Sequence, residues 1–294
     1  MRRSGIDILG ILFGLIALGI VLFAGVTLFS GGGFTDRWSP FTGDFQGFQS
    51  EGRLEESGEE TVEGDFESID LRNIAVSVTV HGWDRDYVQV EYVKNAPTRQ
   101  FLDALYVDIQ RSGGDLEISR EDRKTGPSMR GRIRFEVWIP ETTAALSVRS
   151  VSGRIELDGM SDTVDLDLAT TSGSIQTDNG GNFRAKSISG SVDFISRGGD
   201  VDIRTTSGRI EGTVRDIGPD GRIEIHSVSG SVRIAVPADF GAQVDLRSVS
   251  GSVNTDMPVE VFSSKRNSLE GTLGAGGAEV DISTTSGSIR ILEM

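Results

Sequence analysis

A four-residue signature recurs seven times in the C-terminal half of this chain, and its spacing constrains the fold more than any other feature. Each copy reads Ser or Thr, then Val, Thr or Ile, then Ser-Gly. One turn signature in about every twenty residues is typical of stacked structural repeats, not of a globule closed around one core. The signature glycines are Gly153, Gly173, Gly190, Gly208, Gly230, Gly251 and Gly287, and the serines before them are Ser152, Ser172, Ser189, Ser207, Ser229, Ser250 and Ser286.

Apolar residues alternate on both sides of each signature, which predicts two strands per repeat. Before the first copy, Leu146 and Val148 alternate at even positions. After it, Ile155 and Leu157 alternate at odd positions. A strand cannot change parity in this way, because a one-residue slip turns every side chain to the other face. We therefore predict a corner or bulge in each signature, beginning at Ser150-Val151 in the first copy.

The predicted corner assigns each signature residue to one side of the backbone. Glycine points inward, where its missing side chain allows close backbone approach or a positive φ. The serine before it points outward and is able to hydrogen-bond locally. The β-branched residue is expected to point inward and to stack on its equivalents as a β-branched ladder. The ladder residues are Val151, Thr171, Ile188, Thr206, Val228, Val249 and Thr285.

Together these features predict an all-β fold, a parallel β-helix or β-solenoid with rungs of about 20 residues over residues 141–294. Residues 66–140 have a less regular strand pattern and are predicted to cap one end of the stack. Within the cap we expect a degenerate first rung at residues 69–78 and strands at residues 87–92 and 105–109.

Two further expectations concern the ends of the stack. In the cap, Leu116–Ile118 and Arg132–Ile139 are expected to pair as a hairpin. At the far end, the sequence stops within or just after a strand at residues 289–294, so the last rung is expected to be open and able to mediate self-association. Ser268–Leu273, in the long last interval, is interpreted as a worn copy of the signature.

The N-terminal part carries a charge-free apolar run at residues 8–29, which at roughly 1.5 Å per residue spans the bilayer core as a transmembrane helix. Arg2 and Arg3 precede it, so residues 1–7 are expected in the cytoplasm and the remainder outside. A cleaved signal peptide is the competing interpretation. Residues 30–65 are predicted to be a linker, first rich in glycine and aromatics and then acidic and extended.

The formal net charge of −15 argues against binding to nucleic acid or adsorption to anionic lipid. The chain contains no cysteine, which excludes disulfides and thiolate metal sites. His81, expected in a turn, and His226 are the two histidines, and each is interpreted as an isolated surface residue. No nucleotide-binding, zinc-protease or nucleophile-elbow motif occurs, so neither a cofactor nor a metal is expected.

Carboxylates crowd two of the repeats, at Asp158, Asp162, Asp165 and Asp167 and at Asp200 and Asp202. Carboxylates paired in this way can bind Ca²⁺ or act as acid and base. The favoured interpretation is the solvated face of a strand, because aspartates recur at the same offset before the signature and alternate there with apolar residues. These aspartates are Asp167, Asp202, Asp245 and Asp281.

One basic patch stands out in this acidic chain. Arg130, Arg132 and Arg134 alternate with apolar residues and so share one face of a predicted strand. They are candidates to contact an anionic ligand such as a wall polymer or phospholipid headgroups. The favoured alternative pairs them with Asp115 and Glu117 across the predicted hairpin.

Two segments follow the same order of strand, proline, short link, strand, Ser-Gly and strand. They run from Arg134–Pro140 to Ser152-Gly153 and from Val232–Pro237 to Ser250-Gly251. This module resembles the bacterial putative adhesin family, the LiaG-like cell-surface proteins of unknown function, over roughly residues 66–294. The resemblance implies a β-solenoid ectodomain on the bacterial envelope with a binding or scaffold role, and it implies no catalytic residues.

The leading hypothesis is a non-catalytic, single-pass protein of the bacterial cytoplasmic membrane, with its N-terminus in the cytoplasm, that displays a solenoid surface for binding or adhesion. Its expected partners are the lipid bilayer through residues 8–29 and a cell-wall polymer, glycan or envelope protein. One alternative is a carbohydrate-active enzyme on a β-helix, which a cleft with two carboxylates and an aromatic platform would favour. The other is a self-assembling structural or stress-response partner protein of the envelope.

Overall fold

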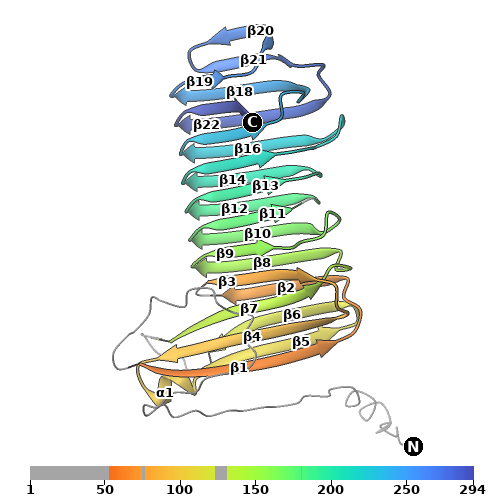
Figure 1. Ribbon diagram of the computed structural model, residues 1–294. Coiled ribbons are helices and arrows are strands. Elements are labelled where there is room, and N and C mark those ends of the chain that lie inside the picture. The colour runs from red at the N-terminus through yellow and green to blue at the C-terminus, as the bar shows by residue number, and fades with distance from the viewer. Residues whose placement is uncertain (1–52, 75–76, 123–130, 180) are drawn as a thin grey trace, which may run out of the picture.

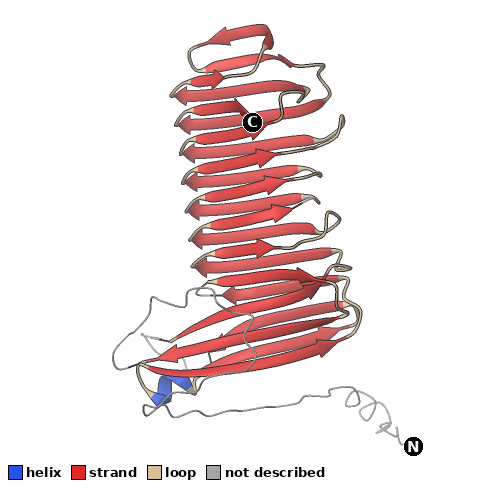
Figure 2. Ribbon diagram, viewed as in Figure 1, coloured by secondary structure: helices blue, strands red, loops and turns tan. Residues whose placement is uncertain are grey.

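A computed structural model describes residues 53–74, 77–122, 131–179 and 181–294. These residues form an elongated all-β solenoid, whose only helix among them is the short α1 (Arg99–Leu102) (Figures 1 and 2). The predicted β-solenoid is confirmed. The predicted transmembrane helix at residues 8–29 lies outside the described residues, within which no helix has the length and apolar character needed to cross a bilayer.

Two long sheets enclose the core, and we call them sheet A and sheet B. The strands of sheet A are β1 (Leu54–Glu63), β3 (Val78–Trp83), β4 (Tyr87–Ala96), β7 (Arg132–Pro140), β9 (Ile155–Asp158), β11 (Ile175–Asn179), β13 (Val192–Ser196), β15 (Ile210–Val214), β17 (Val232–Val236), β19 (Val253–Thr255) and β23 (Ile289–Glu293). In space they follow the order β1-β4-β7-β3-β9-β11-β13-β15-β17-β23-β19.

Sheet B lies on the other side of the core. Its strands are β2 (Ser68–Ile74), β5 (Leu105–Ser112), β6 (Asp115–Asp122), β8 (Ala145–Ser152), β10 (Asp165–Ser172), β12 (Phe183–Ser189), β14 (Val201–Ser207), β16 (Arg222–Ser229), β18 (Ala242–Ser250), β20 (Val259–Lys265), β21 (Ser268–Leu273) and β22 (Ala278–Ser286). In space they follow the order β20-β21-β18-β22-β16-β14-β12-β10-β8-β2-β6-β5.

Each repeat contributes one strand to each sheet, and the signature forms the corner between them. Strands of successive repeats pair in parallel and in register, so that Leu146 lies beside Leu166 and Leu166 beside Phe183. Alternate residues therefore stack into continuous buried columns between the sheets. Such stacking lets a domain without disulfides be held together by apolar packing alone.

The corner itself differs from the prediction at one position. Ser150 is buried, with 6% of its surface exposed, whereas Val151 is 56% exposed. The predicted inward β-branched ladder is therefore wrong, and the small first residue of each signature points inward instead. The pleat continues to the end of β8 at Ser152, and the chain turns only at the glycine that follows. A small hydroxyl residue suits the narrow interior of this corner, where Ser248 Oγ donates to the carbonyl of Gly287 at 2.8 Å.

The signature glycines are required by the stacking of the corners. A Cβ on Gly190 would overlap the carbonyl oxygen of Gly173, and a Cβ on Gly208 would overlap that of Gly190. The same overlap recurs at Gly230. Since the obstacle is backbone, it cannot move aside without breaking the rung below. The backbone of Gly208 also has a φ of 147°, a region that disfavours L side chains.

The cap follows the prediction in part. Strands β2 and β3 pair in parallel with β8 and β9, which confirms a degenerate first rung. The predicted hairpin of Leu116–Ile118 with Arg132–Ile139 is wrong, because β6 and β7 belong to different sheets. Each instead pairs in parallel with one strand of the first rung, β6 with β2 and β7 with β3. The hairpin partners are β5 with β6, and β4 with both β1 and β7.

The acidic segment predicted as an extended linker contributes strand β1 to the edge of the cap. It pairs with β4 over its whole length. Two features make this strand possible. Glu56 forms ion pairs with Lys94 and Arg99, at 3.4 and 3.2 Å, which offsets its charge. A Cβ on Gly58 would overlap the ring of Tyr92 on β4, so glycine leaves room for that ring.

The last rung in sequence lies inside the stack. Strand β22 pairs with β16 on one side and β18 on the other, and β23 pairs with β17 and β19 (Figure 1). The predicted open C-terminal rung is therefore wrong, and both of its edges are occupied. Ser268–Leu273 is not a worn rung, because β21 runs antiparallel to β18 and β20. After β19 the chain forms the hairpin of β20 and β21 and then returns as β22, which lies between β18 and β16.

Replacement of a corner glycine tests the stacking of corners. We expect Gly190→Ala to lower the free energy of unfolding by at least about 2 kcal/mol, because the methyl group has no space beside the neighbouring backbone. Ser189→Ala, at the exposed neighbouring position, is the control and is expected to be nearly neutral. Urea unfolding followed by circular dichroism gives both values. Equal stabilities of the two variants would show that the corners do not require glycine.

Truncation of buried side chains tests the intercalated rung. Ile282→Ala on β22 is expected to cost about 2–5 kcal/mol, as in a central rung, because its cavity is enclosed on both sides. Ile225→Ala on β16 is the central reference, and Val253→Ala on the end strand β19 is expected to cost much less. A small effect of Ile282→Ala, similar to that of the end strand, would contradict the position of this rung.

Candidate functional site

The outer face of sheet A carries a group of aromatic side chains where the cap meets the repeats. We call His81, Trp83, Tyr87 and Trp138 the aromatic cluster. His81 and Trp138 are cross-strand neighbours, and their rings stack with centroids 5.2 Å apart. Trp83 lies 6.1 Å from Trp138 and meets Tyr87 edge-on at 4.8 Å. Such offset and edge-to-face pairs are favourable arrangements for aromatic rings.

The turn between β3 and β4 holds the outer part of this cluster in place. The indole nitrogen of Trp83 donates to the backbone carbonyl of Tyr87 at 2.9 Å. The guanidinium of Arg85 lies 4.8 Å from the ring centre of Trp83 and also donates to the hydroxyl of Tyr87. The polar atom of this indole is thus occupied, and the cation lies over the π face of its ring.

Two carboxylates flank the ring of His81. Asp158 on β9 lies 2.6 Å from Nδ1, and Glu136 on β7 lies 3.2 Å from Nε2. Side chains on three neighbouring strands therefore converge on one imidazole. Glu136 and His81 are each about one-fifth exposed, so the contact between these two side chains is largely shielded from water. Because both ring nitrogens of His81 have a partner, the imidazole is held in one orientation, with its face toward Trp138.

A row of glutamates runs from this site across the cap. Glu59, Glu91 and Glu136 lie directly opposite one another on β1, β4 and β7. Burial raises the pKa of Glu91, the neighbouring Glu59 and Glu136 raise it further, and a hydrogen bond from Gln89 at 2.8 Å opposes the rise. Like charges placed directly opposite destabilise a sheet. The fold thus tolerates an unfavourable concentration of carboxylates beside the aromatic cluster.

The prediction of a turn at His81 is wrong, because His81 lies within β3, and the sequence pattern around it already indicated a strand. Val78 and Val80 alternate as buried residues, so His81 and Trp83 are on the outward face of a strand. The same alternation places Glu136 and Trp138 outward on β7. What the sequence could not supply is the register that brings β3 and β7 side by side.

A groove of about 510 Å³ continues from the cluster along the outer face of sheet A. It starts at Asp158 and extends over the next four rungs. Five carboxylates and one arginine line it: Glu156, Asp158, Asp178, Asp193, Glu211 and Arg233. The polar side chains of this face are therefore mostly hydrogen-bond acceptors.

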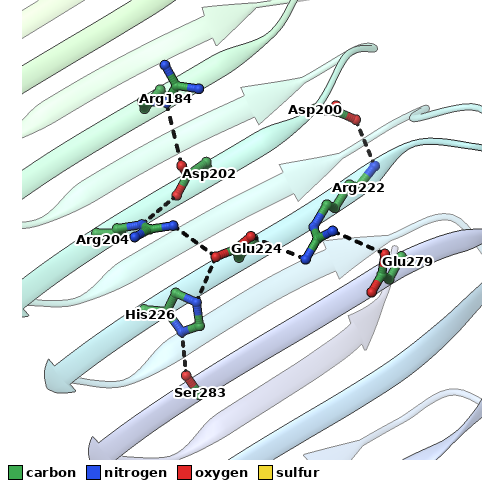
Figure 3. Close-up of polar contacts among 9 residues, drawn as sticks. All are labelled: Arg184, Asp200, Asp202, Arg204, Arg222, Glu224, His226, Glu279 and Ser283. Carbon is green, nitrogen blue, oxygen red and sulfur yellow. Dashed lines mark hydrogen bonds and ion pairs between the residues drawn. The ribbon is translucent and has the colours of Figure 1, made fainter.

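The aspartates that recur before the signature lie on the outer face of sheet B. There they alternate with cations in a network of ion pairs (Figure 3). Arg204 joins Asp202 at 3.1 Å and Glu224 at 2.9 Å, and His226 Nε2 lies 2.9 Å from the same Glu224 carboxylate. The interpretation of these aspartates as a solvated strand face fits this arrangement.

The crowded carboxylates of the first repeat do not converge on one point. Asp158 belongs to sheet A, whereas Asp165 and Asp167 belong to sheet B. Asp162 pairs with Arg197 at 3.0 Å in the loop region. No group of three or more metal-ligating side chains occurs within the described parts of the chain.

The predicted arginine patch is only partly described. Arg130 lies outside the described residues, and Arg132 and Arg134 are exposed on the outer face of β7, opposite Asn95 and Val93. The expected pairing with Asp115 and Glu117 is wrong, because those residues lie in sheet B. Asp115 accepts a hydrogen bond from Ser68 at 2.6 Å, and Glu117 pairs with Arg72 at 3.1 Å. A contact of these arginines with an anionic ligand stays a prediction.

Removal of one charge from the glutamate row is expected to stabilise the protein at neutral pH. The raised pKa of Glu91 means that the folded state binds its proton more readily than the unfolded chain does. Ionised Glu91 therefore costs stability above the raised pKa, and this cost disappears as the pH falls below the unfolded value of about 4.3. Glu91→Gln should add up to about 1 kcal/mol at pH 7 and nothing near pH 3.

Urea unfolding at the two pH values measures this difference. Glu260→Gln, on the exposed edge strand β20, is the control for a general change of net charge. A gain of the same size at both pH values would contradict an origin in carboxylate repulsion.

The toastrack DUF4097 family matches residues 66–211 and again residues 184–292. A search of curated proteins finds no match. Among solved structures, a putative cell adhesion protein from Clostridium sporogenes is similar at 14% identity and a TM-score of 0.42, covering 82% of this chain and 100% of that chain. A putative adhesin from Parabacteroides distasonis is similar at 15% identity and a TM-score of 0.36, covering 81% and 97%.

A putative lipid binding protein, also from Parabacteroides distasonis, is similar at 13% identity and a TM-score of 0.23, covering 82% of this chain and 96% of that chain. Likenesses of this size carry no function from those proteins to this one. The two family matches are stronger evidence than these structural likenesses, because together they span the solenoid from the first rung to the last. The expected family resemblance is confirmed, and the chain belongs to the toastrack DUF4097 family.

Proposed function

We propose that this chain is a non-catalytic surface protein that binds a glycan without negative charge on the outer face of sheet A. The observation that carries the proposal is the aromatic cluster lying beside a row of carboxylates that are directly opposite one another on neighbouring strands. Such a row is unfavourable for the fold itself, and unfavourable local features are expected where a protein has a function.

The two kinds of side chain match the two sides of a sugar ring. A pyranose has an apolar face of C–H groups, which packs on an aromatic ring, and a rim of hydroxyl donors. The partly exposed Trp138 offers aromatic surface beside its stack with His81, and Glu136 and Asp158 offer acceptors on either side of His81. Hydrogen bonds to ionised carboxylates are among the strong ones. A few oriented polar groups beside an apolar surface are typical of ligand sites.

The adjoining groove gives the proposed site room for a polymer. Its acceptors Asp178, Asp193 and Glu211 continue the polar surface beyond the first sugar. The same carboxylates would repel an anionic chain, which is why the proposed ligand is neutral or carries amino groups.

The position of the first strand, β1, supports a membrane anchor at the cap end of the stack, which would leave the outer face of sheet A accessible. Strand β1 belongs to the cap end of the stack (Figure 1). A membrane anchor at residues 8–29, which we retain as part of the proposal, would therefore connect at the cap. The stack would then project outward with its long faces accessible.

One observation favours cleavage of the glycan as a second candidate function. Glu136 and Asp158 are two carboxylates next to an aromatic platform, and paired carboxylates perform acid–base chemistry in glycosidases. Both are bound to the same imidazole, which favours a positioning role and makes binding the better proposal.

Glycan binding is expected to depend on Trp138. The Trp138→Ala variant should weaken binding about tenfold or more in a glycan array followed by calorimetry on the best ligand, because the stacking surface is lost. Phe262→Ala removes another exposed aromatic ring, on β20 at the far end of the stack, and should bind like the parent protein. Equal binding by all three proteins would refute the proposed site.

The same ligand separates binding from cleavage. Release of new reducing ends that is lost in Glu136→Gln would replace the binding proposal by the enzymatic one. Binding without such release supports the proposal as stated.

A further inference from the structure

The outer face of sheet B carries a second groove, of about 750 Å³, with the opposite charge. Its lining contains cations and no carboxylate, although the chain has a formal net charge of −15. We call its charged and titratable side chains the basic row: Arg149, Lys186, Arg204 and His226. These residues occupy equivalent positions on β8, β12, β14 and β16, and Ala169 fills the same position on β10.

The other side of the groove is formed by part of the β-branched ladder, namely Thr171, Ile188, Thr206 and Val228. In spatial order this ladder alternates strictly between an apolar residue and threonine: Val151, Thr171, Ile188, Thr206, Val228, Thr285 and Val249. In sequence order Val249 follows Val228 directly, which breaks the alternation. The alternation appears only in space, because β22, which carries Thr285, lies between β16 and β18. Ile188 and Val228 are 56% and 52% exposed. Exposed apolar side chains next to a row of basic residues form an uncommon surface for an acidic protein.

Neighbouring carboxylates hold part of the basic row in position without filling the groove. Arg149 pairs with Asp70 at 3.1 Å and with Asp167 at 3.4 Å, and these acids lie on the side away from the ladder. The Arg149 side chain remains about half exposed. Exposed ion pairs of this kind contribute little stability, so a ligand can share the cation at small cost. Lys186 has no ion pair with any described residue, and the small Ala169 leaves open space beside it.

We propose that this groove binds a linear anionic polysaccharide that runs along the axis of the stack. Five adjacent strands at a spacing of ~4.8 Å give the groove a length of roughly 19 Å, which suits several sugar units. Acidic groups on the polymer meet Arg149, Lys186 and Arg204, and the C–H faces and hydroxyls of the sugars meet the alternating ladder. The lining has no Phe, Tyr or Trp ring for stacking bases, which disfavours single-stranded nucleic acid.

This site is independent of the one on sheet A. The two grooves lie on opposite faces of the solenoid and are lined by opposite charges. Loss of either kind of binding leaves the other proposal standing.

The test compares the binding of charged and neutral polymers to the full-length protein. Dextran sulfate and polygalacturonate are the anionic probes, and unmodified dextran is the neutral one. Lys186→Glu should weaken anionic binding by about tenfold or more, the equivalent of about 1.4 kcal/mol. Arg290→Glu, which makes the same charge change on the exposed face of β23 in sheet A, should have little effect. Rising salt should weaken binding, since exposed charges are screened.

A second variant tests the ladder without changing charge. Ile188→Thr removes one apolar step while keeping a β-branched side chain, and should weaken the binding of both anionic probes. Equal loss in Lys186→Glu and Arg290→Glu would overturn the proposal, because it would indicate general charge attraction. Absence of binding to both anionic probes, or tighter binding to phosphatidylglycerol vesicles than to either, would also overturn it.

Discussion

From Gly173 onward, the close contact of a corner glycine with the carbonyl of the glycine in the adjacent rung determines the rest of this structure. It brings the backbone of neighbouring corners so near that no side chain fits between them. Because every corner is held in this way, the strands that enter and leave it stay in register over the whole stack. The continuous core, the outer rows of charge and the β-branched ladder all follow from that register. A solenoid stabilised by nearest-neighbour contacts depends on each contact being equivalent to the next.

Much of the fold was predictable because it is local. The alternation of Leu146 and Val148, and the change of parity at Ile155, identify two strands and a corner from sequence alone. That parity alone did not show whether the side chain of Val151 points into the core or toward solvent. Six residues separate Val148, the last apolar residue before the corner, from Ile155, the first one after it, and they can be divided between the two strands in more than one way. The structure resolves the choice by extending the pleat to Ser152.

Contacts between distant segments were harder to foresee, for a different physical reason. The signature at Gly287 is equivalent to that at Gly251, so nothing local indicates that the later rung lies between two earlier ones. His81 and Trp138 are 57 positions apart, and the register of β3 with β7 alone makes them neighbours. The sequence correctly indicated that the aspartates of sheet B form a strand face. It could not indicate that Arg204 and Glu224 meet there, since parallel pairing sets which rungs are adjacent.

The alternation along the β-branched ladder has a consequence for how such a molecule can change length. Its true period is two rungs, and Thr285 keeps the phase by entering between Val228 and Val249. Gain or loss of a single rung would place two apolar residues or two threonines side by side and reverse the phase beyond that point. A chain that must present an unbroken pattern can therefore lengthen or shorten only by pairs of rungs. The natural unit of this solenoid is a doublet, although its sequence repeat is a single rung.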